Sequence, residues 1–140
     1  MLDKTNPDNY PAVQFRIARP TSKLEQVINF YTNGLGLKIL YQFQDHEGYS
    51  GVMIGLPSQQ YHLEFTQEDN SVVCSPPTKD NLLVFYFKTV EDLNLIKKKL
   101  IDLGNQPVEP GNPYWKDKSF TFEDPDGWRV VLHNGLFNLG

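Results

Sequence analysis

Polar and apolar side chains alternate along several short stretches, and one stretch sets a polar face against an apolar one. Tyr61, Leu63 and Phe65 alternate there with His62 and Glu64. Because successive side chains of a strand point to opposite faces, the three apolar residues would face a core. The other face carries an acid and an imidazole, so it is the first place to look for chemistry.

The same pattern organises the whole first half of the chain. Alternation predicts strands at 13–19, 37–43, 49–56 and 60–66. Between the first two strands, apolar residues recur at helical spacing and predict one helix with a single apolar face: Leu24, Val27, Ile28, Tyr31 and Leu35. The predicted order is therefore β-α-β-β-β.

The ends of this helix carry recognisable signals. Ser22 and Glu25 fit a capping box, in which the serine would be the N-cap. Gly34 and Gly36 are expected to end the helix by adopting positive φ.

The second half repeats the pattern. Strands are predicted at 82–87, 106–109, 118–123 and 128–133, and a helix capped by Thr89 carries a stripe of Leu93, Ile96, Leu100 and Leu103. Tyr61 and Trp128 open the last strand of each half, which is a constant offset of about half the chain and indicates an internal repeat.

This repeat defines the expected organisation: an N-terminal arm (1–12), a first module (13–66), a linker (67–80) and a second module (81–134), together one domain. One helix on one sheet leaves the other sheet face bare. We therefore expect the two bare faces to look at each other across a ligand-binding cleft.

Composition excludes several functions. The 140 residues carry a net charge of −4, which argues against nucleic-acid binding, and Lys97 to Lys99 read as a solvated helix face. The single cysteine, Cys74, makes no internal disulfide and no cysteine zinc site. No apolar run is long enough to span a membrane, and the N-terminus does not read as a signal peptide, so we expect a cytoplasmic protein.

Two motifs resemble those of the vicinal oxygen chelate superfamily, which includes glyoxalases, extradiol dioxygenases, and fosfomycin- and bleomycin-resistance proteins. The motifs are Phe30-Tyr31 with Gly34-Leu35-Gly36-Leu37, and Asp124-Pro125-Asp126-Gly127 before the final strand. The resemblance implies an α+β fold, in which two paired βαβββ modules form curved half-barrel sheets around a cleft. It also implies a homodimer.

Enzymes of this superfamily hold a divalent metal with up to four inward residues. The resemblance places these positions at Arg16, Glu64, Leu82 and Val131, with an uncertainty of one residue at Leu82. Leucine and valine cannot ligate, and arginine has no lone pair to offer and repels a cation. We therefore expect no metal and no other cofactor, and we hypothesise a bidentate Arg16–Glu64 pair at the metal's place. The alternative is that both side chains are simply solvated.

Strand parity adds cleft candidates. His62 could be a general acid or base, or a structural histidine. A competing hypothesis is that His62 and His133 together bind zinc. Arg129 could bind an anionic group or pair with Glu64. Tyr86 faces the same way. In a loop, Tyr114 and Trp115 could form a pocket wall, cap a sheet edge or pack on a partner subunit.

Three functions follow from these candidates. The first is a protein that binds a small, aromatic molecule in the cleft without a metal, as bleomycin-resistance proteins do. The second is a metal-dependent lyase or dioxygenase with an atypical ligand set that includes Glu64. The third is metal-free acid–base catalysis by His62 and Glu64. The residues leave the choice between them open.

Overall fold

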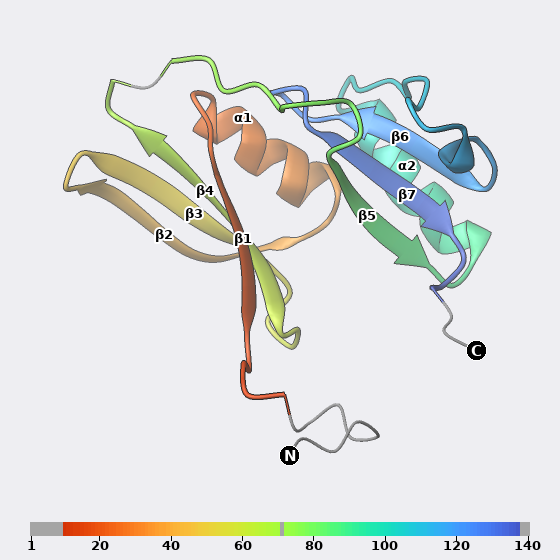
Figure 1. The fold of residues 1–140 in the computed structure, drawn as a ribbon, viewed down its shortest axis with the longest axis horizontal. Helices are drawn as coiled ribbons and strands as arrows, with labels where there is room; N and C mark the ends of the chain where they lie inside the picture. The colour runs from red at the N-terminus through yellow and green to blue at the C-terminus, as the bar shows by residue number, and fades with distance from the viewer. Residues whose placement is uncertain (1–9, 71, 138–140) are drawn as a thin grey trace.

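Each half of the chain folds into one sheet covered by one helix (Figure 1). A computed structural model describes residues 10–70 and 72–137, so most of the expected arm at 1–12 lies outside the described residues. The first half contains β1 (Phe15–Pro20), α1 (Leu24–Asn29), the π-helical turn η2 (Phe30–Gly34), β2 (Lys38–His46), β3 (Tyr49–Gly55) and β4 (Tyr61–Glu68). The second contains β5 (Leu82–Phe87), α2 (Val90–Asp102), the 3-10 turn η3 (Pro113–Lys116), β6 (Ser119–Glu123) and β7 (Arg129–Asn134).

The two sheets share the same order over three strands, and among the described residues only the first sheet has a fourth strand. The strand orders are β1-β4-β3-β2 and β5-β7-β6, with β1 parallel to β4 and β5 parallel to β7. The predicted strand at 106–109 is wrong, because only Val108 pairs, in a single bridge to Thr121. Pro107 and Pro110 flank that bridge, and proline has no N–H to continue a ladder.

The ends of the first helix differ from the prediction. Lys23, not Ser22, is the N-cap, and no side chain of the expected capping box is used. Instead, the Gln67 side chain of β4 accepts a hydrogen bond from the Leu24 amide at 3.0 Å, so a tertiary contact replaces the local cap. The predicted N-cap at Thr89 is confirmed, because the Thr89 side chain accepts a hydrogen bond from the Asp92 amide.

The two glycines of the first helix have separate roles. Gly36 has a φ of 83° and ends the helix as expected. Gly34 does not adopt positive φ; a Cβ there would lie 2.7 Å from the Leu100 side chain. Gly34 therefore lets η2 pack closely against α2, which brings the two halves together.

One apolar core runs through both halves, and it includes Val27, Tyr31 and Phe65 of the first half and Leu93, Leu100 and Leu132 of the second. All six are at least 98% buried. Among the described residues, no helix is long and apolar enough to cross a membrane.

Arg19 joins the two halves through buried charge. Its guanidinium donates to the carboxylates of Asp124 and Asp126, the latter at 3.0 Å, in the turn between β6 and β7. The guanidinium carbon also lies 4.8 Å from the ring centroid of Phe65 and 5.2 Å from that of Trp128. The motif Asp124-Pro125-Asp126-Gly127 is thus a tight turn that binds the first strand of the other module.

Tyr31 completes this group, which we call the inter-module clamp: Arg19, Tyr31, Asp124 and Asp126. The Tyr31 hydroxyl donates to Asp124 at 2.8 Å. Burial raises the pKa of Asp124, although Arg19 and the hydrogen bonds oppose this shift. Burial and the adjacent carboxylate raise the pKa of Tyr31 well above its ordinary value. Burial lowers the pKa of Arg19, but Asp124 and the other partners raise it on balance.

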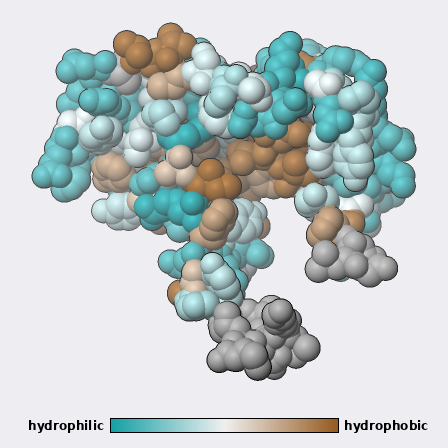
Figure 2. All heavy atoms as spheres, viewed as in Figure 1, coloured by the Kyte–Doolittle hydropathy of each residue, from teal (hydrophilic) through white to brown (hydrophobic). Residues whose placement is uncertain are grey.

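A groove of about 670 Å³ separates the edges of the two sheets. Ile17, Leu37 and Leu63 line it from the first half, and Leu83, Phe85 and Phe87 from the second. The described residues that line it are all uncharged. Figure 2 shows the apolar atoms gathered in the hollow between the halves.

Candidate functional site

Three polar side chains meet on the face of the first sheet that points away from α1. Arg16 pairs in register with His62, and Ala18 with Glu64, so strands β1 and β4 bring these side chains together. The Arg16 Nε atom donates to His62 Nε2 at 2.9 Å, and Arg16 Nη1 lies 3.5 Å from Glu64 Oε1. We call Arg16, His62 and Glu64 the polar trio.

The geometry of the trio corrects one expectation. Arg16 and Glu64 lie together as hypothesised, but their contact is a single one at 3.5 Å rather than a bidentate pair. Because Arg16 Nε can only donate, His62 Nε2 is the acceptor in this hydrogen bond. The lone pair that a general base at His62 would use is therefore engaged by Arg16.

The positions expected to hold a metal do not suit one. Arg16 of β1 pairs with His62 of β4, and Leu82 of β5 pairs with Arg129 of β7. Because β5 and β7 repeat β1 and β4, Leu82 occupies the position that is equivalent to Arg16. The four positions are then Arg16, Glu64, Leu82 and Val131, of which only Glu64 can ligate. Its carboxylate already faces a guanidinium. Within residues 10–70 and 72–137, no group of three or more His, Cys, Asp or Glu side chains is arranged to hold a metal.

Aromatic rings gather on the corresponding face of the second sheet. The His133 ring lies 5.7 Å from Tyr86 and 5.6 Å from Trp115, both edge to face, and Tyr114 lies 4.9 Å from Trp115. The Ser119 hydroxyl is 2.6 Å from His133 Nδ1, which leaves Nε2 for another partner. We call Tyr86, Trp115, His133 and Ser119 the aromatic corner.

Much of this second face is covered rather than open. Val131 lies at its centre, between Val84 and Thr121, and is fully buried although it does not belong to the main core. Arg129 is also buried, and it donates to Glu123 at 3.1 Å and to the Glu109 carbonyl at 2.8 Å.

The structure thus groups the predicted residues into two sets on different sheets. Arg16, His62 and Glu64 form one, and Tyr86, Tyr114, Trp115 and His133 the other. Arg129 contacts Glu123 and not Glu64, and the two histidines of the competing zinc hypothesis lie on separate sheets. Sequence reasoning missed Ser119 and Thr121. Their alternation with Phe120 and Phe122 was the available signal, since it places both hydroxyls on the cleft-facing side.

Comparisons with known proteins identify relatives along most of the chain. The YycE-like N-terminal domain matches residues 15–66, and the YycE-like C-terminal domain matches residues 80–134. The YycE protein of Bacillus subtilis is 49% identical over 126 residues, covering 90% of this chain and 91% of the relative.

Solved structures agree in fold. The crystal structure of the Bacillus subtilis YycE protein, of unknown function, has a TM-score of 0.86 at 49% identity, covering 92% of this chain and 94% of that one. The trypanothione-dependent glyoxalase I of Leishmania major has a TM-score of 0.67 at 20% identity, covering 85% and 84%. TnmS3, an antibiotic binding protein from Streptomyces sp. CB03234, has a TM-score of 0.61 at 20% identity, covering 89% and 95%. The resemblance to the vicinal oxygen chelate fold is confirmed.

Proposed function

Because this chain belongs to the YycE-like family and has the glyoxalase fold, we propose that it binds a small aromatic molecule without using a metal ion. The observation that carries the proposal is the replacement of the metal-ligand set. A guanidinium lies beside the one remaining carboxylate, and two aliphatic side chains fill the other two positions.

The groups that are present suit binding better than ion-assisted chemistry. Tyr86 and His133 offer ring surfaces to a planar guest, and His133 Nε2 offers one hydrogen bond. The polar trio offers the unused N–H groups of Arg16 and an acceptor at Glu64. A fold neighbour described as an antibiotic binding protein, TnmS3, is consistent with such a role.

A thermal-shift screen with planar aromatic compounds, including aromatic antibiotics, tests this function. A compound present at about 100 times its Kd stabilises the protein by about 2.7 kcal/mol, which is a clear rise in Tm. Tyr86→Ala should abolish that rise, because it removes one ring of the aromatic corner. Tyr41→Ala is the matched control, since Tyr41 is an exposed tyrosine of β2. Equal shifts in both variants would contradict binding at this face.

Elemental analysis of the purified native protein separates this proposal from a metal-dependent enzyme. We expect less than a stoichiometric amount of zinc, nickel, manganese or iron. One such ion per chain, lost in Glu64→Ala, would overturn the proposal in favour of a lyase or dioxygenase with an atypical ligand set.

We also propose that the chain forms a homodimer through the apolar groove. Phe15 and Ile17 are exposed on β1, an edge strand that extends beyond the body of the molecule beside the groove (Figure 1). An apolar ridge next to a groove without charged residues is self-complementary about a two-fold axis, and interface cores are depleted of charge.

Sedimentation equilibrium tests the dimer. We expect a dimer for the wild type and a monomer for Ile17→Lys, because the variant places a charge in the groove. Lys38→Ala at the far edge of the first sheet is the control and should stay dimeric. A monomeric wild type at about 100 µM, a concentration well above the Kd of a stable dimer, would contradict the proposal.

A further inference from the structure

One hydroxyl of the second sheet is buried without a partner. Thr121 of β6 is 2% exposed, and its Oγ1 atom has no hydrogen-bond partner among the described residues. The backbone carbonyl of Thr121 is used, since it accepts from the Val108 amide at 2.8 Å. A buried hydroxyl that has lost water and gained nothing destabilises the fold, so such groups are rare and need an explanation.

The residues around Thr121 show why water does not reach it. A narrow gap with no room for a water molecule lies between Thr121, Leu82, Arg129 and Trp115. Pro110, Gly111 and Asn112 also line this space. We call residues 110–116 the Trp115 segment. It closes over the sheet face on which strand parity predicts an open cleft.

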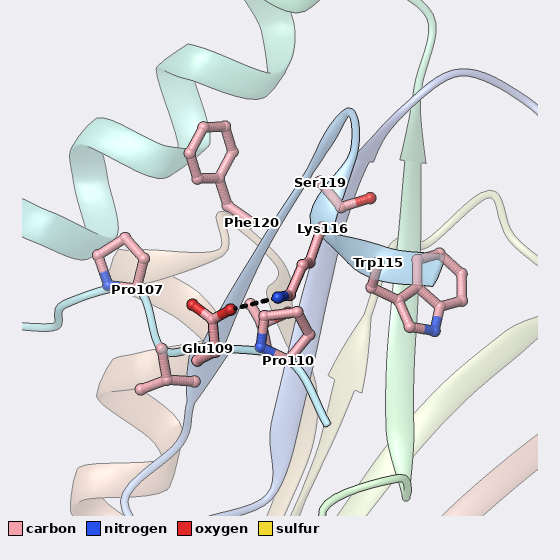
Figure 3. A pocket seen from close by; sticks show the side chains of 9 residues that line it. Pro107, Glu109, Pro110, Trp115, Lys116, Ser119 and Phe120 are labelled. Atoms are coloured by element: carbon pink, nitrogen blue, oxygen red, sulfur yellow. Dashed lines mark ion pairs between the residues drawn. The ribbon is translucent and has the colours of Figure 1, made fainter. Parts of the chain in front are cut away.

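A weak contact lies at the outer side of the segment. Lys116 Nζ lies 3.0 Å from Glu109 Oε1, and both side chains are more than half exposed. In Figure 3 these two groups meet close to Pro110, with Pro107 on one side and Trp115 on the other. Exposed ion pairs contribute little stability. At the downstream end Lys118 has a φ of 62°, a left-handed conformation that a non-glycine residue rarely adopts.

We propose that the Trp115 segment is a lid, that the Trp115 ring occupies the place of a planar aromatic guest, and that Thr121 Oγ1 is the hydrogen-bonding anchor for that guest. This inference rests on the proposed binding function and names the class of ligand. The guest is a flat aromatic molecule about the size of an indole, and it carries one polar group that reaches Thr121. The closed lid leaves the anchor unsatisfied, and the bound guest satisfies it.

The first test concerns the anchor in the free protein. Thr121→Val keeps the shape and removes the unpartnered hydroxyl, so we expect Tm to rise by a few degrees. Thr66→Val on the equivalent face of β4 is the matched control and should change Tm little. A fall in Tm for Thr121→Val would show that the hydroxyl has a stabilising partner and would overturn the proposal.

The second test uses indole as the guest in a variant without the ring. Trp115→Gly should bind indole and gain Tm with it, while the wild type gains far less because its own ring competes. Indene has the same shape without the N–H, so indole should bind about five- to tenfold more tightly, as expected for one hydrogen bond. Trp115→Gly/Thr121→Val should lose this preference. Equal binding of indole and indene to Trp115→Gly would overturn the anchor.

A third test keeps Trp115 and loosens the lid, so it does not depend on the folding of the glycine variant. Lys116→Ala should speed hydrogen exchange at the Trp115 indole N–H by several-fold and leave Trp128 unchanged, as read from the two indole signals in NMR spectra. Lys98→Ala removes a comparable exposed pair, with Asp102 on α2, and is the control. Unchanged exchange in Lys116→Ala would overturn the lid.

The outcomes separate this proposal from the binding function. If screened compounds stabilise the wild type but leave the Trp115 indole signal in place, the protein binds elsewhere and the lid is wrong. If Trp115→Gly binds indole but no screened compound binds the wild type, the lid stands and the binding function fails.

Discussion

Two arginines of β1 lie three residues apart and make opposite use of the same side chain. Arg16 points to the open face, where its side chain is 44% exposed and contacts His62 and one oxygen of Glu64. Arg19 points toward the helices, where its side chain is 9% exposed and bridges two carboxylates between two aromatic rings.

The difference shows that the contribution of an ion pair to stability depends on whether it is exposed or buried. In water a guanidinium gains little from a carboxylate, because solvent screens the pair and the side chains lose freedom. In the interior the same group becomes indispensable once its partners are buried, because removing it strands their charges. Arg16 can therefore contact a ligand at little cost in stability, whereas Arg19 is required to stabilise the fold.

Arg19→Met should have the largest effect of any change to this comparison. It leaves Asp124 and Asp126 buried without their cation, and we expect the free energy of unfolding in urea to fall by about 3–5 kcal/mol. Arg19→Lys keeps the charge but not the planar fork, so it should lose less. The loss in Arg19→Met/Asp124→Asn should be smaller than the sum of the single losses. Additive losses would mean that the clamp is not one coupled unit.

Tyr31→Phe should weaken the clamp by removing the hydroxyl that donates a hydrogen bond to Asp124. The hydroxyl donates to the Asp124 carboxylate at 2.8 Å, and a hydrogen bond to a charged group contributes about 1.5–3 kcal/mol. Denaturant unfolding at pH 7 measures the loss. Tyr41→Phe, at an exposed tyrosine of β2, should change stability little, and a similar loss in both variants would count against the clamp.

The raised pKa of Tyr31 also predicts how stability depends on alkaline pH. In the unfolded chain tyrosine loses its proton near pH 10, whereas in the folded chain it keeps the proton to a higher pH. Stability from this group is complete below about pH 10 and is lost above it, by up to about 1.4 kcal/mol per pH unit. Tyr31→Phe should remove this component of the slope between pH 10 and 12, and Tyr41→Phe should not.

Arg16→Met should have the smallest effect on stability. The contact with Glu64 is long, at 3.5 Å, and the Arg16 side chain is 44% exposed, so we expect a loss of about 0–1 kcal/mol that shrinks further in high salt. Urea unfolding at low and high salt measures it. A loss comparable with that of Arg19→Met would show that the polar trio is structural, and its role in ligand binding would then lose its basis.

Alternation and helical spacing predicted much of the fold because they are local. They gave the repeated β-α-β pattern, the Thr89 cap and the placement of Arg16 and Glu64 on one face. They failed at Ser22, where Gln67 supplies the acceptor from a distant strand. They also could not name the partners of Arg19, because its carboxylate partners lie more than 100 residues away in the sequence.

The candidate site was predictable only in part, for a related reason. Strand parity finds which side chains share a face, and it placed Tyr86 and His133 together. It says nothing about a loop that folds back over that face. The cover formed by the Trp115 segment, and with it the unpartnered Thr121 hydroxyl, depends on tertiary contacts that leave no periodic trace in the sequence.

The residues of the inter-module clamp are translated at widely separated times. Arg19 leaves the ribosome 105 residues before Asp124, which at about 5–20 residues per second is a delay of roughly 5–20 s. Throughout that interval the nascent first half holds an arginine and a tyrosine shaped for partners that have not yet been translated. The clamp therefore forms only after the turn between β6 and β7 has been translated, and the shared interior is completed at that point.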